Sequence, residues 1–273
     1  MVKKGPFVRL VLRRICATPH GVAYCRVASE QKKNAAMRFI LNSGRLPPPM
    51  SKAALAQKAL LLFPASILVL CIMFFLPAGT LDYWQAWAYM AVIFVPAIFV
   101  VLYFLKRDPA FLVRRMKMKE KEARQKLVVG AGLVIFIVGF LLPGLDRRFG
   151  WSNVPAEWSV AADVVVFLGY ALIFLVFREN SYAGRTIEVV KGQKVISSGP
   201  YSIVRHPMYV GVLLMYLSTP IALGSYWAVL PFLLVVPMLV LRILNEEEVL
   251  RRELKGYGAY CKKVRYRMLP FVW

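Results

Sequence analysis

The sequence has few acidic residues, few histidines and few cysteines. Its 273 residues include 14 Asp and Glu against 36 Lys and Arg, which gives a formal charge of +22, and it has only two His. The four cysteines, Cys16, Cys25, Cys71 and Cys261, form no CxxC pair and have no His at metal-binding spacing. We therefore expect neither a zinc or other metal site nor a disulfide framework.

The sequence also lacks the common motifs of nucleotide-binding and hydrolytic enzymes. It has no G-x-G-x-x-G after a strand, no G-x-x-x-x-G-K-[ST], no G-x-S-x-G and no H-x-x-x-H. Any nucleotide-like cofactor must then bind outside a Rossmann domain. The Lys and Arg residues lie between apolar runs and form no single stripe or recognised module, which argues against nucleic-acid binding.

Long stretches of the chain contain no charged residue at all. Such stretches cover 59–81, 83–105 and 127–145, and a shorter one covers 164–177. Hydrophobic residues make up 59% of the chain, and about 20 apolar residues cross a bilayer as a helix. The pattern predicts an all-α, polytopic integral membrane protein whose first four spans lie within 59–177.

One further run, 206–241, contains no Lys, Arg, Asp or Glu over 36 residues. As a single helix it would be about 54 Å long, against a hydrocarbon core of about 30 Å. Pro220 and the pair Gly224 and Ser225 lie near its middle. The run therefore predicts a tight helical hairpin with spans at about 207–223 and 226–244, which brings the total to six.

The distribution of basic residues predicts the orientation. With six spans, 34 of the 36 Lys and Arg residues fall on one side of the membrane, and only Arg147 and Arg148 fall on the other. The positive-inside rule places the basic side, both termini and the segments around 178–206 and after 242 in the cytoplasm.

The first part of the chain carries no recognisable chemistry. Residues 1–49 hold one acidic residue, Glu30, and end in three prolines. We expect residues 1–58 to form a basic, disordered leader, with Met50 as an alternative start of the protein. The predicted division is then 1–58 for the leader, 59–177 for four spans and 178–273 for the functional core.

The richest stretch runs from Gln193 to Gly211. Pro207 has no N–H and disfavours helical backbone at His206, so the imidazole is expected on an irregular lip where a helix begins. The alternative is a capped or core histidine. Arg242 and Glu246 are four residues apart, hence on one helical face, and the hairpin returns them to the membrane surface that holds His206.

Two interpretations of Arg242 and Glu246 remain open from the residues alone. The pair is either an ordinary surface ion pair or one wall of a pocket. A pocket with this acid, this arginine, irregular backbone and the rings of Tyr201 and Tyr209 suits a zwitterionic ligand with an aromatic base.

Three segments taken together resemble a known family. G-P-Y-S-I-V-R-H-P-M-Y-V-G, then a hairpin, then R-I-L-N-E-E-E-V-L and Y-G-A-Y-C-K-K-V-R-Y-R-M-L-P-F, are similar to the isoprenylcysteine carboxyl methyltransferases and their phospholipid methyltransferase-like relatives. The resemblance covers about 178–273. It implies a membrane methyltransferase that uses S-adenosyl-L-methionine in a cytosol-facing pocket capped by the C-terminal segment.

The resemblance also assigns residues. It places Arg242 at the methyl-accepting substrate. The positions that it implies for the cofactor are Gln193, Lys194, Val195, Ile196, Tyr201, His206, Pro207, Met208, Tyr209 and Glu246.

The acceptor is expected to be a lipidated or lipid-like molecule. Carboxylate O-methylation is favoured, because a carboxylate is already ionised near neutral pH and needs no general base. A phospholipid amine or a small thiol would need deprotonation, for which His206 or Glu247 are the candidates. Two other classes remain: a membrane sterol reductase that uses NADPH, and a membrane scaffold without activity.

Overall fold

The computed structural model describes residues 52–116, 123–190 and 192–273, and within these residues all regular structure is helical. The expectations for residues 1–49 and for Met50 lie outside the described residues. The helices are α3 (Lys52–Ala78), α4 (Trp84–Arg107), α5 (Pro109–Arg115), α6 (Ala123–Phe149), α7 (Ala156–Glu179), the 3₁₀ turn η1 (Gly199–Ser202), α8 (Pro207–Ala222), α9 (Val229–Leu233), α10 (Val235–Glu253) and α11 (Tyr257–Lys263). The helical class predicted from the sequence is confirmed.

Five helices of the described part are long and apolar enough to cross a membrane. They are α3, α4, α6 and α7, together with the nearly continuous pair α9 and α10, while α8 with 16 residues is a shorter apolar helix. At 1.5 Å per residue α8 is about 24 Å long, which is less than a typical hydrocarbon core. The prediction of a multi-pass membrane protein is confirmed, whereas the count of six spans is not.

The chain turns between α8 and α9 where the sequence predicts the turn of a helical hairpin. α8 ends at Ala222, and Gly224 adopts a left-handed backbone with φ of 73°. The N–H of Ser225 donates to the carbonyl of Pro220 at 2.9 Å, which closes the turn. α10 continues to Glu253, nine residues beyond the predicted end, so the acidic cluster at 246–248 lies on regular helix.

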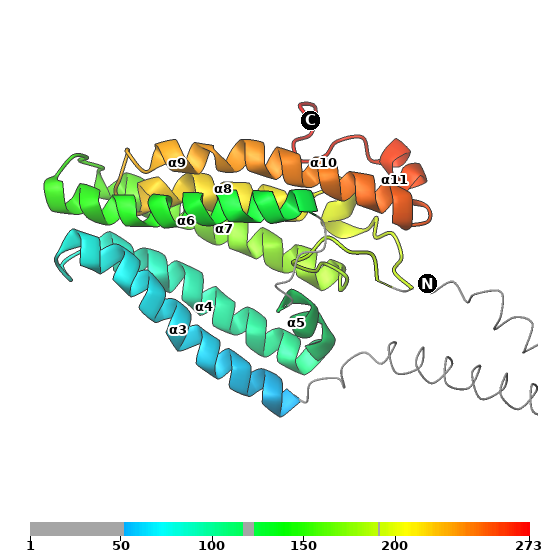
Figure 1. The fold of residues 1–273 in the computed structure, drawn as a ribbon, viewed down its shortest axis with the longest axis horizontal. Helices are drawn as coiled ribbons and strands as arrows, with labels where there is room; N and C mark the ends of the chain where they lie inside the picture. The colour runs from blue at the N-terminus through cyan, green and yellow to red at the C-terminus, as the bar shows by residue number, and fades with distance from the viewer. Residues whose placement is uncertain (1–51, 117–122, 191) are drawn as a thin grey trace, which may run out of the picture. The chain divides into compact units, whose positions relative to one another are not determined.

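α7 and α8 pack against each other (Figure 1), and two glycines face each other where they meet. A Cβ added to Gly169 would lie 2.7 Å from the backbone oxygen of Gly211, and a Cβ added to Gly211 would lie 2.7 Å from that of Gly169. Small residues at such positions let helix backbones approach, as is common in membranes. The approach holds the end of α7, at Asn180, next to the start of α8, at Pro207.

The opposite end of α8 is held by a buried carboxylate. Asp146 of α6 is 1% exposed and accepts hydrogen bonds from the N–H of Ser152 at 2.7 Å and from its hydroxyl at 2.6 Å. The hydroxyl of Ser225 also donates to Asp146. The loop after α6 and the turn after α8 are thereby tied to one side chain.

Candidate functional site

The residues just before α8, Arg205 and His206, which we call the lip, have irregular backbone, as the His-Pro step predicts. His206 is the N-cap residue with φ −126° and ψ 58°, and Pro207 occupies the first turn of α8. The backbone N–H groups of Arg205 and His206 donate to the carbonyls of Tyr266 and Arg267 at 2.9 and 2.8 Å. The C-terminal segment therefore pairs with the lip and holds it in place.

A single buried carboxylate fastens the lip to α10. Glu247 is 3% exposed, and its Oε1 lies 2.8 Å from Arg205 Nε and 3.3 Å from His206 Nε2. Its Oε2 lies 3.2 Å from an Arg251 nitrogen and 3.3 Å from Arg267 Nε. Glu247 thus connects three parts of the chain that are distant in sequence.

In front of the lip lies a cleft of about 880 Å³, including its open mouth, which we call the first cleft. Its walls come from the segment after α7, the lip, α10 and α11. Ten of the residues singled out from the sequence line it: Gln193, Lys194, Val195, Ile196, Tyr201, His206, Met208, Tyr209, Arg242 and Glu246. Pro207 and Glu247 are not among its lining residues, because Pro207 is packed in α8 and Glu247 lies behind His206.

Tyr209 connects the acid and the arginine of α10. Its hydroxyl donates to Glu246 Oε2 at 2.6 Å and accepts from Arg242 Nε at 3.0 Å. Arg242 also donates to the carbonyl of Arg185 at 2.6 Å. Arg242 and Glu246 therefore line a cleft wall, which is the second of the two interpretations from the sequence, and a tyrosine of the neighbouring helix connects them.

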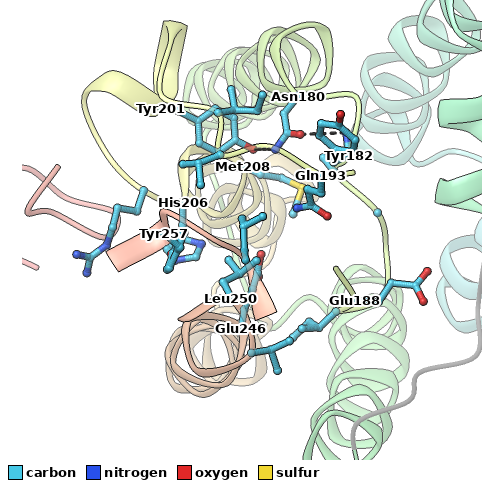
Figure 2. A pocket seen from close by; sticks show the side chains of 18 of the residues that line it. Asn180, Tyr182, Glu188, Gln193, Tyr201, His206, Met208, Glu246, Leu250 and Tyr257 are labelled. Carbon is cyan, nitrogen blue, oxygen red and sulfur yellow. Dashed lines mark hydrogen bonds between the residues drawn. The ribbon is translucent and has the colours of Figure 1, made fainter. Parts of the chain in front are cut away.

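Among the lining residues that were not singled out from the sequence, two have polar side chains that bear on the chemistry of the cleft. Asn180 donates to the Tyr201 hydroxyl at 2.9 Å, accepts from the N–H of Tyr182 at 3.0 Å, and lies at the end of α7 (Figure 2). Burial raises the pKa of Tyr201 to about 12, so this phenol stays protonated at neutral pH. The place of Asn180, three residues after the end of the apolar run at Phe177, was a weak signal that could have identified it.

The second such residue is Tyr257, at the start of α11. It is 4% exposed, and within the described residues its hydroxyl has no hydrogen-bond partner. A buried hydroxyl without a partner costs about 1–3 kcal/mol, so a phenol in this state at a cleft wall is suited to a bound molecule. The only sequence signal for Tyr257 was that it begins the Y-G-A-Y segment.

The lining chemistry matches an amphipathic, cationic ligand. Figure 2 shows Asn180, Tyr201, Met208 and Gln193 grouped on one side and Glu246 and Leu250 of α10 on another. Carboxylate, phenol and amide groups are thus combined with Met, Leu and aromatic surface, which is the usual composition of a cofactor site. The residues present therefore fit S-adenosyl-L-methionine, which joins a positive sulfonium and an ammonium to a purine.

The comparisons with known proteins match a region of the chain that includes most residues lining the first cleft. Residues 158–256 match the family model described as phospholipid methyltransferase. A curated relative, the Delta(14)-sterol reductase of Mus musculus, is 33% identical over 106 residues, which cover 36% of this chain. The chain spans about a quarter of the length of that relative, since the match covers 25% of it.

Among solved structures, the eukaryotic intramembrane Ras methyltransferase, an isoprenylcysteine carboxyl methyltransferase, matches with a TM-score of 0.41 and 17% identity. The match covers 90% of this chain and 94% of that chain. The family-model match begins two residues into α7 and includes the lip, α8, α9 and the whole of α10, which bears Arg242 and Glu246. Over residues 158–256 the protein thus carries the sequence pattern of the phospholipid methyltransferase family, which confirms the resemblance predicted from its sequence.

Proposed function

We propose that the protein is a membrane-embedded methyltransferase that uses S-adenosyl-L-methionine and acts on a lipid-like acceptor. The observation that carries the proposal is the first cleft, in which a carboxylate, an unpartnered buried phenol and apolar walls converge. The match of residues 158–256 to a methyltransferase family supports the same activity. With α8 counted as a sixth span, the positive-inside rule supports a cytoplasmic position for the cleft and both termini.

Each part of the cleft has a proposed role toward the cofactor. Glu246 faces the positive charge, and Tyr257 supplies a hydroxyl donor. Gln193, Lys194, Val195 and Ile196 contribute the backbone and side-chain wall opposite α10, while Tyr201, Met208 and Tyr209 supply ring and thioether surface. His206 and Pro207 hold the start of α8 in the position from which Met208 and Tyr209 reach the cleft.

When bound, S-adenosyl-L-methionine supplies an electrophilic methyl group for an in-line displacement. The residues of the chain then have to align donor and acceptor and keep water away. Glu247 is held among Arg205, His206, Arg251 and Arg267, so we assign it a positioning role. For an amine or thiol acceptor, His206 is the residue on the cleft wall that could take the proton.

Among acceptor classes we favour a carboxylate, with Arg242 as the residue that receives it. Arg242 lines the first cleft and also a second cleft beside it, so it lies at the boundary between them. A guanidinium can bind a carboxylate through two parallel hydrogen bonds.

A second candidate is an NADPH-dependent reductase, because a Delta(14)-sterol reductase is 33% identical over 106 residues. The deciding experiment is calorimetry with the full-length protein in detergent, using S-adenosylhomocysteine and NADPH as ligands. Saturable binding of S-adenosylhomocysteine alone supports the methyltransferase, and binding of NADPH alone supports the reductase. Binding of neither ligand would favour a scaffold.

The acceptor is tested by transfer of a labelled methyl group. The panel contains a prenylcysteine carboxylate, a phospholipid amine and a small thiol, each presented in the same neutral detergent. We expect label in the carboxylate. Label in the amine or thiol instead would contradict carboxylate O-methylation while leaving the cofactor assignment intact.

A further inference from the structure

Residues 181–185, which we call the partition, border both the first and the second cleft and form neither helix nor strand. Tyr182, Ala183 and Gly184 line the first cleft, while Gly184 and Arg185 line the second. Backbone carbonyls outside regular structure need partners from other segments. The position of the partition therefore depends on groups that reach it from elsewhere in the chain.

Two neighbouring arginines of α5 bond to carbonyls of the partition. Arg114 Nε donates to the carbonyl of Ser181 at 2.9 Å. Arg115 donates to the carbonyl of Gly184 at 2.8 Å. Hydrogen bonds from a charged donor are stronger than those between neutral groups. α5 thus holds the backbone of the partition at two points, three residues apart.

α5 is itself fixed in place, so its arginines can set the position of another segment. Asp108 caps the helix by accepting from the N–H of Phe111 at 3.0 Å, and its other carboxylate oxygen lies 3.1 Å from Arg114. Phe111 is 1% exposed, and its ring centroid lies 5.0 Å from that of Phe177 in α7. The guanidinium carbon of Arg115 lies over the Phe177 ring, 4.7 Å from its centroid. Both arginines are therefore anchored along their length before they reach the partition.

On the wall of the first cleft, the partition is bonded to residues that we expect to meet the cofactor. The side chain of Asn180 accepts from the N–H of Tyr182 at 3.0 Å and donates to the Tyr201 hydroxyl at 2.9 Å. The backbone carbonyl of Asn180 accepts from the N–H of Ala183 at 3.2 Å. A shift of the partition would therefore move Tyr182 and disturb the contact between the amide and the phenol.

We propose that Arg114 and Arg115 are positioning residues that fix the partition and thereby the shape of the first cleft. This role rests on the proposed function, because it gives the two arginines an indirect part in holding S-adenosyl-L-methionine. α5 lies outside residues 158–256, so the site extends to a part of the chain that the family-model match does not include. Arg115 lines the second cleft together with Arg242, which holds the carbonyl of Arg185, so α5 and α10 both fasten the partition.

The test combines local hydrogen exchange with ligand binding on the full-length protein in detergent. Arg114→Met and Arg115→Met each keep a long apolar side chain but remove the donors. Without ligand, exchange at the N–H groups of Tyr182 and Ala183 should become about tenfold faster or more, the scale of one hydrogen bond to a charged group. The affinity for S-adenosylhomocysteine, measured by calorimetry, should fall about tenfold for the same reason.

Two further variants separate positioning from a general loss of stability. Arg115→Lys retains a charged donor, so its exchange rates and its affinity should lie between those of Arg115→Met and the unaltered protein. Arg107→Met is the control, because it removes one positive charge from the exposed last turn of α4. Both readouts should be unchanged in the control, and exchange within α8 and α10 should be unchanged in every variant.

Several outcomes would overturn the proposal. Unchanged exchange at Tyr182 and Ala183 in both Met variants would show that the arginines do not hold the partition. Exchange that is equally faster in α8 and α10 would show general loosening instead of positioning. Faster local exchange with unchanged affinity for S-adenosylhomocysteine would show that the partition does not shape the cofactor site.

Failure of the proposed function would look different. It would appear in the unaltered protein, as absence of S-adenosylhomocysteine binding, and would reject the cofactor role of the partition as well. If the unaltered protein binds S-adenosylhomocysteine and the Met variants bind it equally well, the proposed function stands and the positioning role alone is rejected.

Discussion

A buried carboxylate from another helix lies near each end of α8, and the two carboxylates differ in the groups that surround them. Asp146 is near the end at Ala222 and accepts hydrogen bonds from the neutral groups of Ser152 and Ser225. Glu247 is near the start at Pro207 and is surrounded by cationic side chains, with a cleft in front of the histidine that it holds. Asp146 does not line the first cleft.

The difference separates a polar cluster that joins two loops from one that borders the cleft in which we propose that a ligand binds. The Asp146 cluster connects two loops and uses its acceptor oxygens within the protein. The region around Glu247 also places the carboxylate of Glu246 and the unpartnered hydroxyl of Tyr257 on a cleft wall. Removing one side chain at a time should therefore affect stability at one end, and both stability and ligand binding at the other.

The largest effect is expected for Glu247→Ala. The change leaves Arg205 and His206 buried without their anionic partner, which typically costs about 3–5 kcal/mol of stability. Thermal unfolding of the purified protein in detergent should show a large drop, and S-adenosylhomocysteine affinity should fall with it. Glu248→Ala, on an exposed neighbour in the same helix, is the control. A drop of the same size in the control would remove the special role of Glu247.

Glu246→Gln should separate binding from stability. The substitution keeps the shape but removes the charge that faces the cofactor, so binding of S-adenosylhomocysteine should weaken by about 1.5–3 kcal/mol. The unfolding temperature should change little. Calorimetry that finds the same affinity in the variant and in the unaltered protein would contradict the proposed role of this acid.

Asp146→Ala provides the reference at the other end of α8. Loss of its hydrogen bonds leaves the half-buried Ser152 and the buried Ser225 without their acceptor, and we expect about 1–3 kcal/mol of destabilisation. Cofactor affinity measured well below the unfolding transition should remain unchanged. If the affinity falls as much as in Glu246→Gln, the two ends are coupled and the comparison fails.

The smallest effect is expected for Tyr257→Phe. The hydroxyl has no partner within the described residues, so its removal should leave stability equal or slightly higher. S-adenosylhomocysteine affinity should fall by about 0.5–1.5 kcal/mol, the usual net contribution of one hydrogen bond. Unchanged affinity would show that this hydroxyl does not meet the cofactor.

Particular residues show how far sequence reasoning reached. The charge-free runs predicted the long helices, and Gly224 with Ser225 predicted the turn, because both depend on local composition and backbone preference. The helix spacing of Arg242 and Glu246 was equally local. The count of six spans stays unconfirmed because α8, which begins and ends within one residue of the predicted span at 207–223, has only 16 residues and is shorter than the helices long enough to cross a membrane.

Other features depended on contacts between distant segments. No local signal connected Glu247 to Arg267, or Arg115 to Arg242, because 20 and 127 residues separate them along the chain. The hydrogen bonds of Tyr209 with Glu246 and Arg242 form only when α8 and α10 pack side by side with these residues at the same level along the two helices. Asn180 and Tyr257 were missed because the part each plays depends on contacts with distant segments: the amide of Asn180 meets Tyr201, and the hydroxyl of Tyr257 lies at the wall of the first cleft.

The amino-acid sequence by itself determined that this protein is helical, that it lies in a membrane, and which stretch precedes the short apolar helix, because apolar run length, proline and glycine act on the local backbone. Tertiary structure alone decided which side chains line a common cleft and which pair with one another in the interior. Burial and pairing are set by neighbours from distant parts of the chain, so one glutamate, Glu247, holds the lip while the next along the helix, Glu246, lines the first cleft.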